Sequence, residues 1–203
     1  MGDQRPGGVT ASGDGRPPAP RIGDRWHCDG AADGPLVCWA EGVRDEYRQV
    51  TSLGEALGTA GELSARTVIL DVEPAVAVWG DDQHDLDRGV ARVLRQAAAV
   101  PGVLVVCFAT NSARRPTAMP SCPGVRVVYL ASAGKPFRTA PYRGFPAPVI
   151  LIGDQVATDG VLAWRLGCAF VQFLPDPGRV PPGPRLLSRG GQAIRPALFS
   201  ARR

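Results

Sequence analysis

Short apolar segments rich in β-branched residues recur along the middle of the chain. There are five of them, at residues 67–71, 103–109, 125–130, 148–153 and 168–174. Each segment is continuously apolar and does not alternate between apolar and polar positions. This pattern indicates strands covered on both faces, as in a parallel sheet.

Helical periodicity appears between several of these segments. A helix is predicted over residues 85–100, because one of its faces collects apolar side chains and Pro101 ends it. The apolar face consists of Leu86, Val90, Val93, Leu94 and Ala97. A second helix is predicted over residues 156–167, and a third opens at a capping box formed by Ser52 and Glu55.

Strands that alternate with helices predict an α/β fold with a doubly wound, mainly parallel, five-stranded sheet, which we place at residues 51–175. Residues 1–20 are rich in Gly, Pro and polar side chains, which predicts a disordered N-terminal tail. Residues 21–50 are expected to form an N-terminal extension with one strand at 35–40. Residues 176–203 are expected to form a Pro/Gly/Arg-rich C-terminal tail.

The composition is that of a globular protein, since 44% of the 203 residues are hydrophobic and 21% are charged. No apolar stretch reaches the roughly 18 residues that a membrane-spanning helix needs. The N-terminus lacks the apolar core of a secretory signal, so we expect a cytoplasmic protein. The five cysteines are scattered without a CxxC pair, which favours reduced structural thiols over disulfides or a zinc site.

The net charge of +4 comes almost entirely from arginine. Of the 23 basic residues, 22 are arginine and the single lysine is Lys135. An ammonium point charge and a planar guanidinium are not interchangeable, so a lysine kept in such a chain indicates a specific role. We expect no specific nucleic-acid partner. For the basic C-terminal tail, a solvated segment is favoured over peripheral contact with an anionic membrane surface.

Polar residues follow the apolar segments at the point where each segment ends. In chain order they are Asp71, Thr110, Asn111, Lys135, Asp154 and, just beyond, Asp159. Ligands of such sheets bind beyond the carboxyl ends of the strands, so we expect these side chains to converge.

This set of residues has the chemistry of phosphoryl transfer. The carboxylate of Asp71 can attack phosphorus and form an aspartyl-phosphate. Mg²⁺ held by Asp71, Asp154 and Asp159 would offset the repulsion between carboxylate and phosphate. Lys135 and Thr110 would hold the phosphoryl oxygens and neutralise their charge.

The order of these residues resembles the motifs of the haloacid dehalogenase (HAD) superfamily of phosphohydrolases. The resemblance lies in an Asp at the first strand, Thr-Asn at the second, Lys-Pro at the third and Gly-Asp followed by another Asp at the fourth. The stretch GDQVATDGVLAWRLG, residues 153–167, is similar to the fourth motif of the phosphatidylglycerophosphatase-like branch, subclass IIIA. The resemblance covers about residues 50–175.

The resemblance implies a HAD-like Rossmannoid phosphatase that requires Mg²⁺. Its implied catalytic residues are Asp71 as nucleophile, Glu73 as general acid/base and Lys135. The implied phosphate-binding residues are Thr110, Asn111 and Lys135, and the implied metal ligands are Asp71, Glu73, Asp154 and Asp159. The segments between the motifs are too short to hold a cap domain. A capless, open cleft suits bulky phosphorylated substrates such as a lipid headgroup, or a site closed by the second subunit of a homo-oligomer.

Two functional hypotheses remain open for these residues. The leading one is the Mg²⁺-dependent phosphatase. The alternative is a catalytically weak HAD-fold binding or regulatory module, because Glu73 and Ala75 replace the Asp and Thr of the family's first motif. Single residues also have simpler interpretations, since Asp154 or Asp159 would cap a helix equally well. The chain lacks a P-loop and a G-x-G-x-x-G turn, which argues against a nucleotide-dependent NTPase or dehydrogenase.

Overall fold

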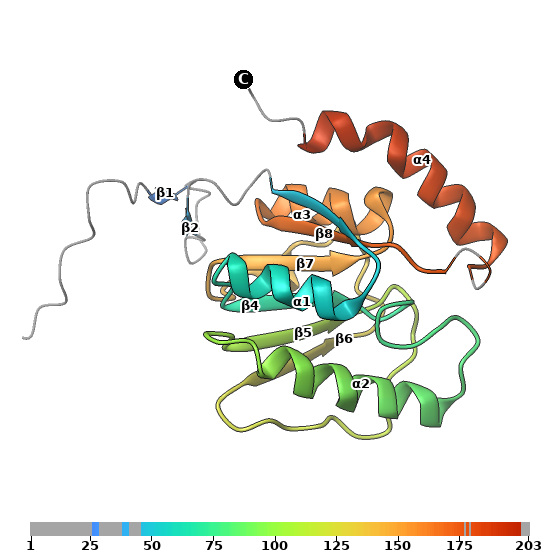
Figure 1. Ribbon diagram of the computed structural model, residues 1–203, viewed down its shortest axis with the longest axis horizontal. Helices are drawn as coiled ribbons and strands as arrows, with labels where there is room; N and C mark the ends of the chain where they lie inside the picture. Colours follow the sequence, from blue (N-terminus) through green and yellow to red (C-terminus); the bar gives the residue numbers. More distant parts are fainter. Residues whose placement is uncertain (1–25, 29–37, 41–45, 177, 179, 200–203) are drawn as a thin grey trace, which may run out of the picture.

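The computed structural model describes residues 26–28, 38–40, 46–176, 178 and 180–199 (Figure 1). The expected N-terminal tail, residues 1–20, lies outside the described residues, as do most of the expected N-terminal extension and the last four residues. Within the extension, strands β1 (Trp26–Cys28) and β2 (Cys38–Ala40) form an antiparallel pair. Strand β2 falls inside the strand expected at 35–40.

A six-stranded, fully parallel sheet forms the centre of the molecule, in the order β3-β8-β7-β4-β5-β6. Its strands are β3 (Tyr47–Val50), β4 (Thr67–Asp71), β5 (Val105–Ala109), β6 (Arg126–Leu130), β7 (Val149–Gly153) and β8 (Ala169–Phe173). The predicted α/β, doubly wound, parallel fold is therefore confirmed, but the predicted number of five strands is wrong. The missed strand, β3, is a short edge strand whose sequence YRQV carries two polar residues, so it lacks the continuous apolarity of the others.

Helices cover both faces of the sheet. Helices α1 (Leu53–Glu62) and α2 (Gln83–Ala98) lie on one face, and α3 (Val161–Leu166) and α4 (Pro182–Phe199) lie on the other (Figure 1). The side chain of Ser52 accepts a hydrogen bond from the backbone N–H of Glu55, as the capping box predicts. The helix expected over 156–167 begins with one π-helical turn, η2 (Val156–Gly160). A short 3₁₀ turn, η1 (Ala140–Tyr142), precedes β7.

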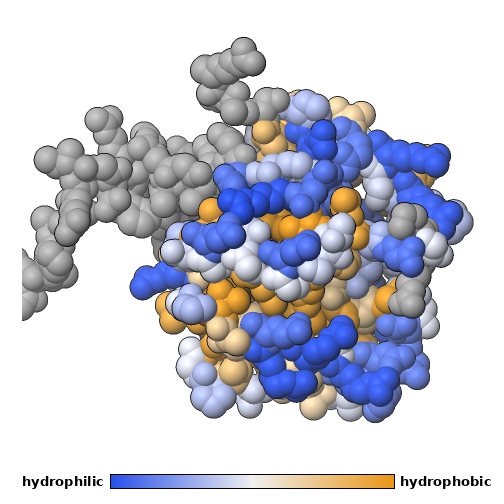
Figure 2. Space-filling view, viewed as in Figure 1, coloured by the Kyte–Doolittle hydropathy of each residue, from blue (hydrophilic) through white to orange (hydrophobic). Residues whose placement is uncertain are grey.

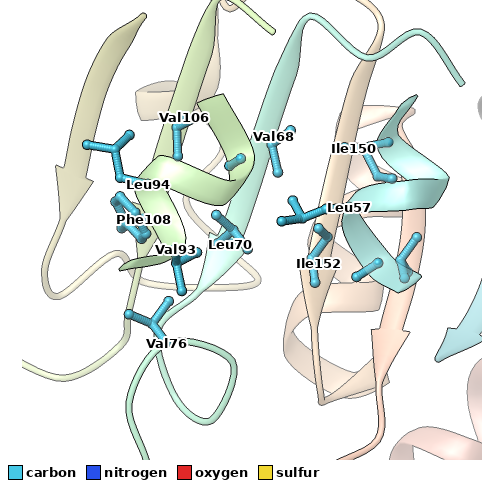
Figure 3. Close-up of a cluster of buried hydrophobic side chains, with 14 of the residues drawn as sticks. Leu57, Val68, Leu70, Val76, Val93, Leu94, Val106, Phe108, Ile150 and Ile152 are labelled. Carbon is cyan, nitrogen blue, oxygen red and sulfur yellow. The ribbon is translucent and has the colours of Figure 1, made fainter. Parts of the chain in front are cut away.

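Alternate residues of the strands enter two separate hydrophobic cores. On the α1/α2 face, side chains such as Leu70, Phe108 and Ile152 pack against Leu57 and Val93 (Figure 3). The strand residues that alternate with these point to the opposite face and form the core on the α3/α4 side. They include Ile69, Cys107, Leu151 and Phe170. Burial on both faces of β4, β5 and β7 explains why these segments are almost continuously apolar.

The C-terminal segment is the second place where the structure differs from expectation. Residues 182–199, which we expected within a solvated or loosely packed tail, form the helix α4, which packs chiefly against the π-helical turn η2. The ring of Phe199 lies 5.3 Å from that of Tyr47 and 5.7 Å from that of Phe170. Gly191 has no side chain, which lets the helix approach the backbone of Ala157 closely. This packing depends on residues far apart in the sequence, so local composition did not reveal it.

Among the described helices, none has the length and the apolar character that a crossing of the bilayer requires.

The order of the strands places a switch point at β4. From β4 the chain continues outward through β5 and β6, then returns to the other side of β4 to form β7 and β8. All the loops that follow the strands meet at one edge of the sheet. In α/β folds of this kind, the crevice at the switch point is the usual place for a ligand.

Replacement of Phe108 tests the α1/α2 core. Phe108 is fully buried on the interior strand β5, so Phe108→Ala should lower the free energy of unfolding by about 3–5 kcal/mol through lost burial and a residual cavity. Urea denaturation measures the change. Leu104→Ala, at a half-exposed position just before the same strand, is the control and should have a much smaller effect. Equal losses from the two variants would contradict the assignment of the core.

Candidate functional site

The loops at the switch point surround an open cavity of about 380 Å³. The end of β4 contributes Asp71 and Glu73, and the loop after β5 contributes Thr110, Asn111, Ser112 and Arg114. Lys135 reaches the cavity from the loop after β6, and Gln155 and Thr158 come from the segment after β7. Leu187 of α4 and Trp79 complete the wall.

Lys135 lies between two buried carboxylates. Its Nζ atom is 2.8 Å from Oδ1 of Asp71 and 2.7 Å from Oδ1 of Asp159. Lys135 is only 6% exposed, and Asp159 is fully buried. An ammonium so far from water is stable only with charged partners at hydrogen-bond distance, which these carboxylates supply.

The side chain of Asn111 positions the backbone of Lys135. Its Nδ2 donates to the Lys135 carbonyl at 3.0 Å, and its Oδ1 accepts from the Lys135 N–H at 2.8 Å. Both ends of this amide are therefore used to fix the backbone of the lysine.

Asp154 is the unpartnered acid of the site. It is 2% exposed, and neither of its carboxylate oxygens has a hydrogen-bond partner among the described residues. The backbone carbonyl of Asp154 accepts from Nε2 of buried Gln172 at 2.8 Å, which holds the residue in place. The side chain is thus not a helix cap, and its unpartnered carboxyl group lies close to those of Asp71 and Asp159.

Burial and mutual repulsion shift the proton affinities of these groups. Burial raises the pKa of Asp71 well above its ordinary range, Asp159 raises it further, and Lys135 opposes both. Burial and the charge of Asp159 raise the pKa of Asp154 to about 8. Burial alone would lower the pKa of Lys135, but Asp159 and Asp71 outweigh it and raise that pKa. Three carboxylates and one ammonium leave the cluster with a net charge of −2 when all four groups are ionised.

A divalent cation fits the acids of this cluster. Carboxylate oxygens of Asp71, Asp154 and Asp159 lie within 4.8 Å of one another. Hard cations such as Mg²⁺ prefer oxygen ligands of this type, and the orphaned oxygens of Asp154 need a positive partner. These three residues would hold the ion.

The approach of Asp159 depends on the absence of a side chain at position 153. A Cβ atom at Gly153 would lie 2.5 Å from Cγ of Asp159, closer than such atoms come in proteins. The π-helical turn η2 directs Asp159 inward, and its Oδ2 accepts from the backbone N–H of Gln155 at 3.3 Å. The Gly-Asp sequence therefore contributes in two ways: Asp154 is itself one of the acids, and Gly153 leaves the space that the Asp159 carboxyl group occupies.

Glu73 belongs to a neighbouring polar group. Thr110 Oγ1 donates to Glu73 Oε2 at 2.7 Å, and Ser112 Oγ donates to Oε1 at 3.4 Å. The Arg114 guanidinium is 3.8 Å from the same carboxylate. Glu73, which we also expected among the metal ligands, lies outside the cluster formed by Asp71, Asp154 and Asp159.

The structure brings all seven residues predicted for the site to one edge of the sheet. They are Asp71, Glu73, Thr110, Asn111, Lys135, Asp154 and Asp159. Sequence reasoning missed Ser112 and Arg114. They could have been found from their place in the same loop, since both follow Thr110-Asn111 within three residues. It also missed Gln172, which the apolar context of its strand concealed, and Leu187, for which the sequence carries no local signal.

Comparison with known proteins adds no relative. A scan against protein-family models matches none of them, and searches of the curated proteins and of the solved structures find no match.

Asp154→Asn tests the buried, uncompensated charge. The folded state retains a proton on Asp154 up to about pH 8, whereas the unfolded state loses it near pH 4. Between about pH 4 and pH 8 the folded state binds more protons than the unfolded state. The free energy of unfolding of the metal-free protein should therefore fall as the pH rises through this range. At pH 8 without divalent ions, Asp154→Asn should raise the free energy of unfolding by about 1–3 kcal/mol.

Thermal unfolding with and without Mg²⁺ completes this test. Mg²⁺ should raise the Tm of the wild type and leave that of Asp154→Asn nearly unchanged, because the variant lacks a charged ligand. Asp85→Asn is the control, since Asp82, His84 and Asp85 form a second, more exposed acidic group. A Mg²⁺ shift lost in Asp85→Asn and kept in Asp154→Asn would contradict the assignment.

Gly153→Ala tests the close approach of Asp159. The added methyl group must displace the Asp159 carboxyl, and overpacking of this kind costs about 1–3 kcal/mol of stability. The matched control is Gly58→Ala in α1, where nothing lies within 4 Å of the new Cβ. That substitution should stabilise the helix by about 0.5–1 kcal/mol. Chemical denaturation of both variants gives the comparison, and a neutral Gly153→Ala would contradict the contact.

Proposed function

We propose that this protein is a Mg²⁺-dependent phosphatase of the HAD type that works through an aspartyl-phosphate on Asp71. The observation that carries the proposal is the buried ion group in which Lys135 joins Asp71 to Asp159 beside the unpartnered Asp154. A purely structural ion pair does not need a further buried carboxylate without a partner, because such a charge is costly. A site that binds a cation and a phosphate does need it.

Asp71 has the position of a nucleophile. Lys135 engages its Oδ1 atom, so Oδ2 is the oxygen that would attack phosphorus. The new bond joins Oδ2 to phosphorus, and the bond from phosphorus to the ester oxygen breaks. The Lys135 ammonium neutralises charge on the phosphoryl oxygens as it builds up. A bound Mg²⁺ would supply additional neutralisation of charge between the carboxylate and the phosphate.

Glu73 has the position of the general acid/base. It would give its proton to the departing ester oxygen, then take a proton from the water that attacks the aspartyl-phosphate, which releases inorganic phosphate and restores Asp71. Its contacts with Thr110 and Ser112 hold the carboxylate at the cavity wall. These contacts fix the longer Glu side chain in one orientation.

One observation favours a second candidate function, a binding or regulatory module with weak turnover. The Thr110 hydroxyl donates to Glu73, although a phosphate-binding hydroxyl should donate to the phosphoryl group. If that hydrogen bond persists when phosphate is bound, Thr110 cannot donate to the phosphoryl group and Glu73 cannot transfer a proton to the leaving group. The pocket would then bind a phosphoryl group without efficient hydrolysis.

Hydrolysis of p-nitrophenyl phosphate, with and without Mg²⁺, separates the two functions. The wild type should show Mg²⁺-dependent turnover, and Asp71→Asn should reduce it at least about a thousandfold because the nucleophile is lost. Glu73→Gln should reduce it by about 10²–10⁴-fold, the usual contribution of a general acid/base. The control Glu62→Gln, at the exposed end of α1, should leave turnover unchanged.

Glu73→Asp distinguishes an enzyme from a module. If the wild type has no Mg²⁺-dependent turnover and Glu73→Asp creates it, the phosphatase proposal is wrong and the module interpretation stands. If both proteins are active, the additional methylene of Glu73 is tolerated.

A further inference from the structure

A second cavity, of about 370 Å³, lies at the same edge of the sheet as the candidate active site. Its apolar lining comes from separate elements: Leu53 begins α1, Phe173 ends β8, and Ala75, Val78 and Trp79 belong to the loop between β4 and α2. The volume suits a small aliphatic or aromatic group, since ligand pockets start at about 300 Å³.

The polar residues of this cavity are confined to its rim. Arg92, Gln96 and Asp176 line it and are exposed. Figure 2 shows apolar surface between the polar outward faces of α1 and α2, on the side of the sheet where the cavity opens. The two cavities differ in the residues that line them: this one is lined mainly by apolar side chains, whereas the wall of the active-site cavity carries Asp71, Glu73, Arg114 and Lys135.

The two cavities share a wall. Trp79 lines both of them and is half-buried between solvent and the loop. Glu73 lines the active-site cavity, and the next residue, Pro74, lines the apolar one. Glu73, which would face the ester oxygen, is therefore the chain neighbour of a residue of the apolar cavity, and Trp79 borders both cavities.

We propose that the apolar cavity is a subsite for the alcohol part of the substrate, so that preferred substrates are phosphomonoesters of a compact apolar alcohol, either aliphatic or aromatic. This inference rests on the proposed phosphatase function. The phosphoryl group occupies the charged cavity, and the apolar group occupies the hollow lined by Leu53 and Trp79. Because each buried methylene contributes about fourfold in affinity, the subsite discriminates between esters by the length of their apolar group.

Binding of two alkylphosphonates, measured by calorimetry in the presence of Mg²⁺, tests the subsite without any need for turnover. Hexylphosphonate should bind at least about tenfold more tightly than methylphosphonate, which cannot reach past Trp79. Leu53→Gln should reduce this ratio at least about threefold, because it places an amide in the apolar lining. Leu104→Gln is the matched control, since Leu104 is a half-exposed leucine just before β5 and lines neither of the two cavities described here; it should leave the ratio unchanged.

Turnover of ethyl phosphate and hexyl phosphate separates this inference from the proposed function. The ratio of their kcat/KM values should favour hexyl phosphate to a similar degree. Leu53→Gln should lower this ratio, and the control Leu104→Gln should leave it unchanged. Equal affinities for the two phosphonates, no binding of either, or a preference insensitive to Leu53→Gln would overturn the subsite. Turnover of both esters without chain-length dependence would overturn the subsite and leave the phosphatase intact. A third outcome is that hexylphosphonate binds more tightly than methylphosphonate, Leu53→Gln reduces this difference, and neither ester is turned over. This outcome would support the subsite and refute the phosphatase.

Discussion

The contact of the Lys135 ammonium with two buried carboxylates is the interaction on which the site depends. Asp71 ends the central strand β4, and Asp159 lies beyond the adjacent strand β7, so their negative charges would repel each other in a buried part of the molecule. Lys135 enters from a third loop, fixed by both ends of the Asn111 amide, and compensates for that repulsion. Removal of one member of such a group leaves a buried charge without its partner, which typically costs about 3–5 kcal/mol. The same ionic contact therefore joins three loops.

The parallel sheet makes this convergence possible, because it delivers the carboxyl ends of β4, β5, β6 and β7 to one edge. Burial on both faces keeps the strands rigid and removes water from beneath the site. The low dielectric that results raises the pKa values of Asp71 and Asp154. Gln172 extends the support outward, since its Oε1 accepts hydrogen bonds from Tyr47, Gln49 and Gln192. Through this single amide, the edge strand β3 and the helix α4 are connected to the backbone of Asp154.

Trp79 lines both cavities. One cavity is lined by Asp71, Lys135 and Glu73 with its hydroxyl partners, and the other mainly by apolar side chains, with Arg92, Gln96 and Asp176 among its lining. The ligand proposed to occupy both cavities is amphipathic, with a compact anionic head and an apolar substituent. The proposed chemistry and the proposed choice of substrate are connected at this point. Glu73, which would protonate the leaving group, precedes Pro74, which lines the apolar cavity.

The sequence by itself determined the class of fold and the residues that gather at the switch point. Continuous apolar segments specify buried parallel strands through local pattern alone, and the polar residue that ends each segment is carried to the common edge by any parallel arrangement. Only the tertiary structure decided how those residues pair. Local pattern does not specify that Lys135 lies between Asp71 and Asp159, that Asp154 lacks a partner, or that Glu73 contacts Thr110, because each contact joins separate loops. The edge strand β3, the docking of α4 through Phe199 and the apolar cavity also arise from contacts between distant segments. The physical reason is that hydrophobic periodicity is a property of neighbouring residues, whereas electrostatic and cavity geometry are properties of the packed chain.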